Sequence, residues 1–107
     1  MELLKYEKLN RLFSHYHNLL TDKQKDYFKM YYFNDYSLSE IAEIMNVSRN
    51  AVYDQLKRVE AKLLEYEEAL KLDEKSNIRR KYYDKYLKTN DLKYLNLLIE
   101  MDDEEDE

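Results

Sequence analysis

The stretch that decides the fold is SLSEIAEIMNVSRNAVYDQLKR, which spans residues 37–58. Ser37 followed three residues later by Glu40 is a capping box, so the pattern predicts that a helix begins at about Leu38. Asn46 predicts a sharp end to this helix, because asparagine adopts left-handed backbone more readily than other non-glycine residues. Between these two signals, apolar side chains share one helical face, namely Leu38, Ile41, Ala42 and Met45.

A second helix is expected to follow at once. Val47 is apolar and can fill the corner between the two helices, and Ser48 can cap the second one. The inner face of the second helix carries Ala51, Val52 and Leu56. Its outward face carries Arg49, Asn50, Tyr53, Lys57 and Arg58. This order of small residue, turn residue, corner residue and cap predicts a helix-turn-helix whose second helix can enter a DNA major groove. The alternative is an ordinary helical corner that binds nothing.

The segment from Leu20 to Glu68 resembles the YlxM-like family of small bacterial helix-turn-helix proteins, above all at YSLSEIAE and VSRNAVYDQLKR. It is also similar to the fourth conserved region of bacterial sigma factors, where a helix-turn-helix reads promoter DNA. Members of the YlxM-like family are usually encoded beside the GTPase of the signal recognition particle. The resemblance therefore implies a sigma-like DNA-binding module with a role in the signal recognition particle pathway.

The resemblance can be carried over at individual positions. It implies that Ser48 and Arg49 are the cap and the first basic residue that sigma-type recognition helices turn toward DNA. Tyr53 and Asp54 depart from the arginine and glutamine usual in sigma factors, although they suit the YlxM-like pattern. An acidic Asp54 facing phosphates would weaken binding, so the promoter-element specificity of sigma factors is not carried over.

Composition predicts an all-α fold. The 107 residues include no glycine and no proline, so turns must be made by Asn, Asp, Ser or Thr, which suits helices joined by short loops. We expect one helical-bundle domain over residues 1–101, containing a sigma-region-4-like helix-turn-helix with a long recognition helix. The acidic tail DDEEDE, residues 102–107, is expected to be disordered.

Several function classes lack a signal in the sequence. There is no cysteine, and a chain without glycine cannot form a P-loop or a dinucleotide fingerprint of the usual form. His15 and His17 are two residues apart in a predicted helix, so they point to different sides and cannot jointly hold a metal. We therefore expect a non-enzyme with no cofactor and no metal. The N-terminal residues have no apolar leader core and no membrane-length apolar run follows, which predicts a cytoplasmic protein with no membrane partner.

The net charge of −5 is unevenly distributed. Residues 1–58 carry nine Lys/Arg against eight Asp/Glu, a net +1, whereas residues 59–107 carry nine against fifteen, a net −6. DNA is thus not excluded from the helix-turn-helix half. Because few phosphates would be neutralised, we expect a modest and salt-sensitive affinity.

Two further helices are expected before the helix-turn-helix. Residues 2–20 should form the first. A second begins after the cap Thr21, with Gln24 as its reciprocal partner. It carries six large side chains in seven positions: Tyr27, Phe28, Met30, Tyr31, Tyr32 and Phe33. One interpretation is a platform that binds nucleic-acid bases or a protein partner. The other, which is favoured, is a central helix that is contacted on several sides.

Beyond the recognition segment, apolar residues recur with a period of 3.5, the pattern of a coiled-coil seam. This seam consists of Val52, Leu56, Val59, Leu63, Tyr66 and Leu70. Recognition helix and seam should form one helix, unbroken until Asp73. Its partner is the first helix, the C-terminal helices, or the same helix of a second subunit. We favour the last, a homodimer through this seam.

The C-terminal part is expected to hold two more helices. Ser76 can cap the first of them, in which tyrosines alternate with basic residues. Such a helix can contact phosphates and stack on bases, but an amphipathic helix with a solvated basic rim is the favoured interpretation. The last helix should run from Leu92 to Met101.

Two functions follow from these patterns. The first is a DNA-binding regulator in which Arg49 and Asn50 reach base edges and Tyr53 makes an apolar or stacking contact, while phosphates are held by Ser48, Lys57 and Arg58. The rival is an interaction module that docks on signal recognition particle protein or RNA, without sequence-specific DNA binding. The weak positive charge of the outward face favours the rival.

Overall fold

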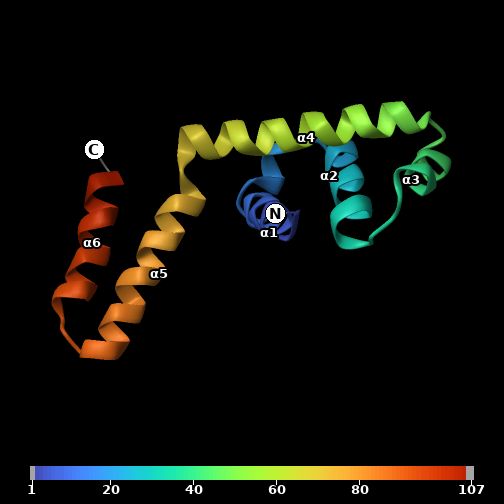
Figure 1. Cartoon of the computed structure of the whole chain (residues 1–107). Helices are drawn as coiled ribbons and strands as arrows, with labels where there is room; N and C mark the ends of the chain where they lie inside the picture. The colour runs from blue at the N-terminus through green and yellow to red at the C-terminus, as the bar shows by residue number, and fades with distance from the viewer. Residues whose placement is uncertain (1, 106–107) are drawn as a thin grey trace. The chain divides into compact units, whose positions relative to one another are not determined.

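A computed structural model of the chain describes residues 2–105, which are all-α and contain no β-strand (Figure 1). This confirms the fold class that the absence of glycine and proline predicted. The chain divides into two compact units, residues 1–71 and residues 72–107. The single domain expected over residues 1–101 stays a prediction. No helix in the described part of the chain is long and apolar enough to cross a membrane.

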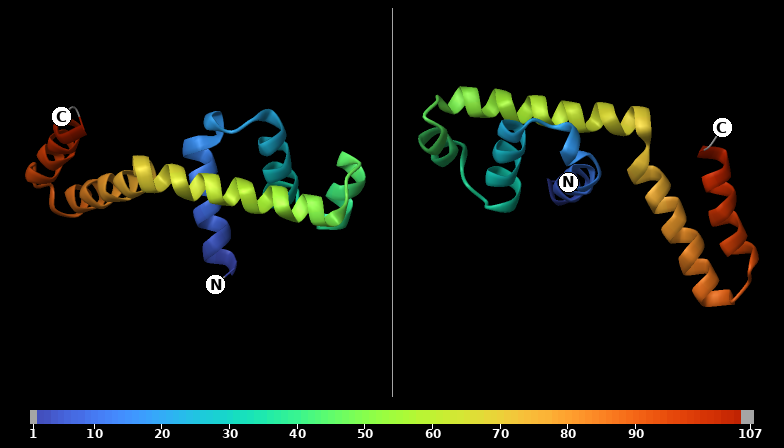
Figure 2. Two further views of the ribbon diagram at one scale, coloured as in Figure 1. Left: turned by 90° about the horizontal axis from the view of Figure 1, so that it is seen from above. Right: turned by 180° about the vertical axis from the view of Figure 1, so that it is seen from behind.

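Unit 1 is built around its longest helix, α4 (Arg49–Leu70). Four shorter helices and one helical turn precede or flank it along the chain: α1 (Glu2–Tyr16), η1 (His17–Leu19), α2 (Asp22–Phe28), η2 (Lys29–Phe33) and α3 (Leu38–Met45). Both α1 and α2 pack against α4, and Figure 2 (left) shows α1 running across it. The long recognition helix is therefore the surface on which the rest of unit 1 is assembled.

The second helix has the start that the sequence predicted. The Gln24 amide donates to Thr21 Oγ1 at 3.1 Å, and the Thr21 amide donates to Gln24 Oε1 at 2.9 Å. The helix then widens into the π-helical segment η2, where the Asn34 amide reaches the Lys29 carbonyl at 3.0 Å. Asp35, with φ of 56°, makes the turn toward α3.

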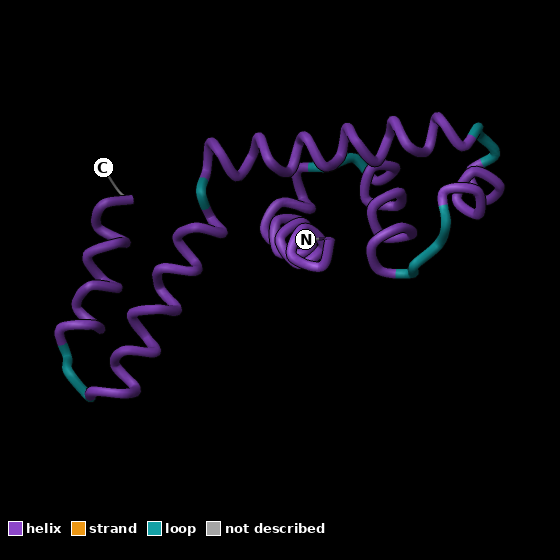
Figure 3. The backbone as a smooth tube through the Cα atoms, viewed as in Figure 1, coloured by secondary structure: helices purple, strands orange, loops and turns teal. Residues whose placement is uncertain are grey.

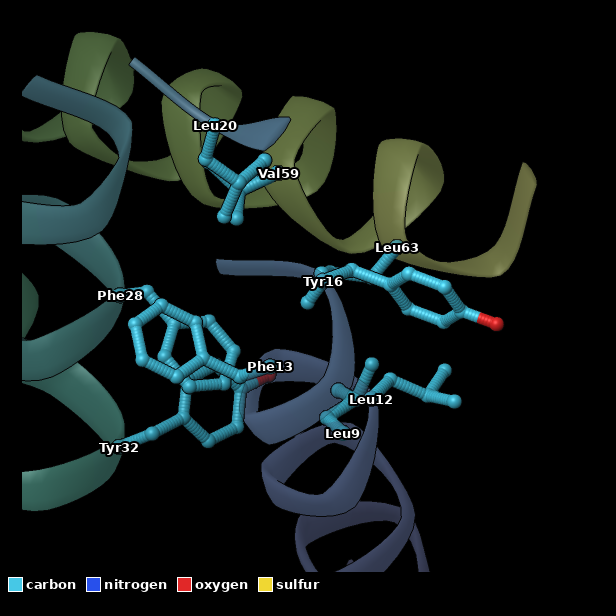
Figure 4. Packing of buried hydrophobic residues seen from close by; sticks show 9 residues of the cluster. All are labelled: Leu9, Leu12, Phe13, Tyr16, Leu20, Phe28, Tyr32, Val59 and Leu63. Atoms are coloured by element: carbon cyan, nitrogen blue, oxygen red, sulfur yellow. The ribbon is translucent and has the colours of Figure 1, made fainter. Parts of the chain in front are cut away.

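The core of unit 1 lies where α1, α2, η2 and α4 meet (Figure 4). At its centre the rings of Phe13 and Phe28 stack with centroids 4.4 Å apart and planes 1° from parallel. Of the six large side chains of the second helix, four are buried, and only Phe33 is about half exposed. This is the arrangement that the favoured interpretation predicted, a central helix touched on several sides.

The seam of α4 is filled within unit 1. Val52, Val59 and Leu63 have no exposed surface and Leu56 is 4% exposed, because α1, α2 and α3 all pack on α4. Only the end of the seam is open, since Leu70 is 45% exposed. The prediction that two subunits pack through this seam is therefore wrong, because the seam residues are already buried within one chain.

The break after α4 comes earlier than expected. Lys71 adopts left-handed backbone, with φ of 56°, and ends α4 two residues before Asp73. Helix α5 (Leu72–Thr89) begins at once, so Ser76 lies in its interior and does not cap it. Two acidic residues in the first turn, Asp73 and Glu74, suit the positive end of the helix dipole in place of the predicted serine cap.

Unit 2 is a helical hairpin of α5 and α6 (Lys93–Glu105), joined by a short turn (Figure 3). Asn90 supplies the turn with φ of 57°, and Asp91 Oδ1 accepts a hydrogen bond from the Lys93 amide at 3.0 Å. Helix α6 begins one residue after the expected Leu92 and continues beyond Met101 to Glu105, so residues 102–105, which were expected to be disordered, are helical. Of the acidic tail, residues 106 and 107 lie outside the described residues.

Candidate nucleic-acid interface

The helix-turn-helix starts with the predicted capping box. The Glu40 amide donates to Ser37 Oγ and the Ser37 amide donates to Glu40 Oε1, both at 3.1 Å. These two bonds satisfy backbone donors that the first turn of α3 would otherwise leave unpaired. Ile41, on the inner face of α3, is fully buried and packs in a cluster with Val52 and Leu56 of α4. The short helix is thereby fixed to the inner face of the recognition helix.

The turn is formed at Asn46, as the sequence predicted. Asn46 has φ of 54° and ψ of 49°, in the left-handed region. Its amide donates to the Glu43 carbonyl at 3.3 Å, and the Val47 amide donates to the Ala42 carbonyl at 3.0 Å. This pair of bonds is a Schellman motif, which reverses the chain at the end of a helix. Val47 is 36% exposed and so covers the corner only in part, less than the predicted filling of the corner.

Ser48 caps the recognition helix. Its hydroxyl oxygen accepts a hydrogen bond from the Ala51 amide at 3.1 Å, and the Val52 amide donates to the Ser48 carbonyl at 3.1 Å. The predicted cap is confirmed. Since the Ser48 oxygen is engaged by the helix, the hydroxyl proton is the part that remains able to donate to an anion.

All six residues predicted to contact nucleic acid are exposed and lie at one end of α4 or on its cap: Ser48, Arg49, Asn50, Tyr53, Lys57 and Arg58. From Arg49 to Arg58 the helix rises about 14 Å at 1.5 Å per residue. Arg49, Tyr53 and Lys57 follow each other at four-residue intervals, so they share one face. Asp54 is exposed on the same stretch and reduces its positive charge.

Lys57 already has two partners in this structure. Its ammonium lies 3.5 Å from Glu60 Oε2 and 5.4 Å from the centre of the Tyr53 ring. The Glu60 carboxylate raises the pKa of Lys57 above its ordinary value, so the lysine keeps its charge. A phosphate that binds Lys57 must therefore compete with the Glu60 carboxylate for the ammonium.

A cavity of about 210 Å³ lies beside Tyr53 and Lys57, and sequence reasoning missed it. Its wall includes Tyr6, Tyr31 and Tyr32, and Lys5 enters it with its ammonium 3.7 Å from Glu60 Oε2. Lys5 and Tyr6 belong to α1, so only the three-dimensional packing brings them to the recognition helix. The sequence did show the aromatic run of the second helix, but it could not show that Tyr31 and Tyr32 line this cavity.

These features define a class of protein. A capped recognition helix, fixed by a shorter helix across a left-handed turn and exposing a run of polar, basic and aromatic residues, is the architecture of helix-turn-helix proteins. Residues 3–103 match the family described as "Putative helix-turn-helix protein, YlxM / p13 like". The chain belongs to this family.

Relatives from this family, which is named UPF0122, match most of the chain. The UPF0122 protein YlxM of Bacillus subtilis is 51% identical over 85 residues, which are 79% of this chain and 77% of the relative. A UPF0122 protein of Bacillus licheniformis is 50% identical over 91 residues, 85% of each chain. The UPF0122 protein YofM of Lactococcus lactis is 48% identical over 88 residues, 82% of this chain and 79% of the relative.

Proposed function

We propose that the protein is a DNA-binding regulator that acts by occupying DNA and recruiting partners in the cytoplasm, without enzymatic chemistry. Arg49 and Asn50 read base edges in the major groove. Lys57 and Arg58, together with the Ser48 hydroxyl, contact backbone phosphates and set the register. Tyr53 makes an apolar or stacking contact.

The observation that carries this proposal is the exposure of all six residues at the start of a helix whose other face is buried. Val52 and Leu56 hold that helix on α3, and Ser48 fixes its first turn. A major groove about 12 Å wide admits such a helix only when nothing covers its outer side. The described residues of unit 1 leave this outer side open.

The charge of the face sets the expected affinity. Arg49, Lys57 and Arg58 are accompanied by Asp54 and by the carboxylate that holds Lys57. One protomer therefore neutralises few phosphates and binds weakly at physiological salt. The proposal includes a homodimer, in which two recognition helices engage adjacent half-sites and the second contact is made at high effective concentration.

A specific observation favours a second candidate, docking on signal recognition particle RNA. The cavity beside the recognition helix combines tyrosine rings with the ammonium groups of Lys5 and Lys57. Rings of this kind stack on unpaired bases, at about 1–3 kcal/mol per base, and cations hold the adjoining phosphate. In this mode Tyr53 stacks on an RNA base and Lys57 contacts the adjoining phosphate, and Arg49 and Asn50 are not required.

One binding experiment separates the two functions. Fluorescence anisotropy at physiological salt would compare a random duplex DNA pool, signal recognition particle RNA and the GTPase of that particle as binding partners. The DNA proposal expects duplex to be bound, with an affinity that falls as salt rises. Binding of RNA or GTPase with no duplex binding would replace the first function by the second.

A further inference from the structure

Unit 2 has no apolar core of its own. In the part of the hairpin whose burial is described, residues 72–103, the one buried side chain is that of Asp73. Every apolar residue there is half-buried or exposed, and five large ones are exposed: Leu72, Tyr83, Leu87, Leu92 and Ile99. A pair of helices without a buried apolar core between them is marginal in water. We therefore expect the exposed apolar residues of the folded hairpin to pack against another protein surface.

The exposed apolar residues gather along one side of α5. Tyr83 and Leu87 are four residues apart, and Leu72 lies three helical turns before Tyr83, so the three share a face. Tyr83 also lines an open groove of about 510 Å³ between α5 and α6. Because Leu72, Tyr83 and Leu87 remain exposed, α6 covers only part of the apolar surface of α5.

Helix α6 also exposes apolar residues. Leu98 lines the groove opposite Tyr83. Leu95 and Ile99 are four residues apart and share another face of α6, and Leu92 lies in the turn just before this helix. We name these two stripes with the groove between them the hairpin face. The groove itself is lined by charged as well as apolar side chains, including those of Arg79, Arg80 and Asp102. Exposed apolar stripes with charges between them mark an interaction surface.

The charges of the hairpin indicate what covers this face. Helix α5 carries six Lys/Arg against three Asp/Glu, a net +3, whereas α6 carries one against five, a net −4. Within the chain, Arg79 and Asp102 already pair across the two helices at 3.4 Å, and both remain partly exposed. A surface with a basic half and an acidic half is complementary to a copy of itself turned by 180°, because each basic helix then faces an acidic one.

We propose that the hairpin face binds a second copy of itself, and that the two hairpins form a four-helix bundle with twofold symmetry. Two hairpins of antiparallel helices with apolar stripes along their inner sides are the components of such a bundle. The interface uses residues of unit 2 only and includes none of the six residues proposed to contact nucleic acid. The hairpin face is thus the interface of the homodimer proposed above, and this inference does not depend on DNA binding.

Sedimentation equilibrium across the micromolar range tests this interface. The test variants are Ile99→Lys on α6 and Leu87→Lys on α5, whose side chains are 62% and 56% exposed in the single chain. The matched control is Ile44→Lys on α3, the same substitution at a side chain that is 57% exposed. Circular dichroism verifies that each variant remains helical.

We expect a wild-type dimer, an unchanged dimer for Ile44→Lys, and a dissociation constant raised at least about tenfold for both hairpin variants. A wild-type monomer would overturn the inference and the proposed homodimer together. Hairpin variants that dimerise like the control would overturn the inference alone, since another surface would then join the subunits. Duplex binding is measured separately, so a failure of DNA binding is distinguishable from both results.

Discussion

The Tyr32 hydroxyl donates a hydrogen bond to the Glu60 carboxylate, 28 residues further along the chain. Tyr32 belongs to the aromatic core, where its ring stacks on Phe28 with centroids 4.4 Å apart. Glu60 belongs to the recognition helix and also holds the ammonium groups of Lys57 and Lys5 at 3.5 and 3.7 Å. One carboxylate thus ties the core of unit 1 to cations at the edge of the candidate interface.

The buried state of Tyr32 predicts a loss of stability at high pH. Burial, followed by the neighbouring Glu60 carboxylate, raises the pKa of Tyr32 well above its ordinary value of 10.0. The folded protein therefore keeps the phenol proton where the unfolded chain releases it. The stabilisation is fully present below pH 10 and declines as the pH rises from there toward the raised pKa, by at most about 1.4 kcal/mol per pH unit.

Urea unfolding of wild type and Tyr32→Phe between about pH 8 and pH 11 measures this effect. Every other tyrosine is present in both proteins, so their titration cancels in the comparison. The free energy of unfolding should fall more steeply above pH 10 in the wild type. Parallel curves would show that Tyr32 ionises as easily in the folded protein as in the unfolded chain.

Two substitutions in the recognition helix should affect DNA binding in different ways. Arg49→Ala should weaken specific duplex binding by about 1–3 kcal/mol, because it removes a contact to base edges. Lys57→Ala should weaken binding to all sequences alike and lower the salt slope by about one. Lys62→Ala is the control, since it removes the same charge from an exposed position about 20 Å along the helix from Arg49. Wild-type affinity in both test variants would exclude this end of α4 from the interface.

The turn at Asn46 gives a prediction about stability alone. Asn46→Gly should be tolerated or slightly stabilising, because glycine reaches a φ of 54° without a side-chain clash. Asn46→Val should destabilise the protein markedly, since a β-branched residue resists positive φ. Thermal denaturation compares the two. Equal melting temperatures would be incompatible with a left-handed residue at this position.

Two adjacent leucines test where the seam is covered. Leu63 is fully buried within unit 1, whereas Leu64 is 46% exposed. Leu63→Ala should lower the free energy of unfolding by about 2–5 kcal/mol, because it opens a cavity in the core. Leu64→Ala should change it by about 0.5 kcal/mol or less. If Leu63→Ala instead left stability unchanged and altered the oligomeric state, the seam would lie between subunits after all.

Local signals predicted the parts of the fold that depend on neighbouring residues. The caps at Thr21, Ser37 and Ser48 and the left-handed turn at Asn46 each arise within one helical turn, so four or five residues are enough to recognise them. The exposure of Arg49 and its neighbours follows from helical periodicity in the same way. Whether these residues bind nucleic acid stays a prediction.

Features that depend on distant residues could not be predicted. No pattern in the sequence distinguishes a seam filled by α1 from one filled by a second subunit, because both present apolar residues to α4. The approach of Lys5 to Glu60 requires α1 to cross α4, which periodicity does not specify. The break at Lys71 has no usual turn residue to mark it, since lysine rarely adopts left-handed backbone.

The crossing of α1 over α4 also determines when the protein can fold during its synthesis. The Tyr16 hydroxyl bonds to Glu67 Oε1 at 2.7 Å, and Leu12 shares a cluster with Leu63. At about 5–20 residues per second, a ribosome needs roughly 3–10 s to add the residues between Leu12 and Leu63. The part of the first helix that packs on α4 therefore stays uncovered for several seconds after it emerges. Phe28 of α2 can cover Phe13 earlier, and the arrival of the recognition helix then completes the burial of the first helix.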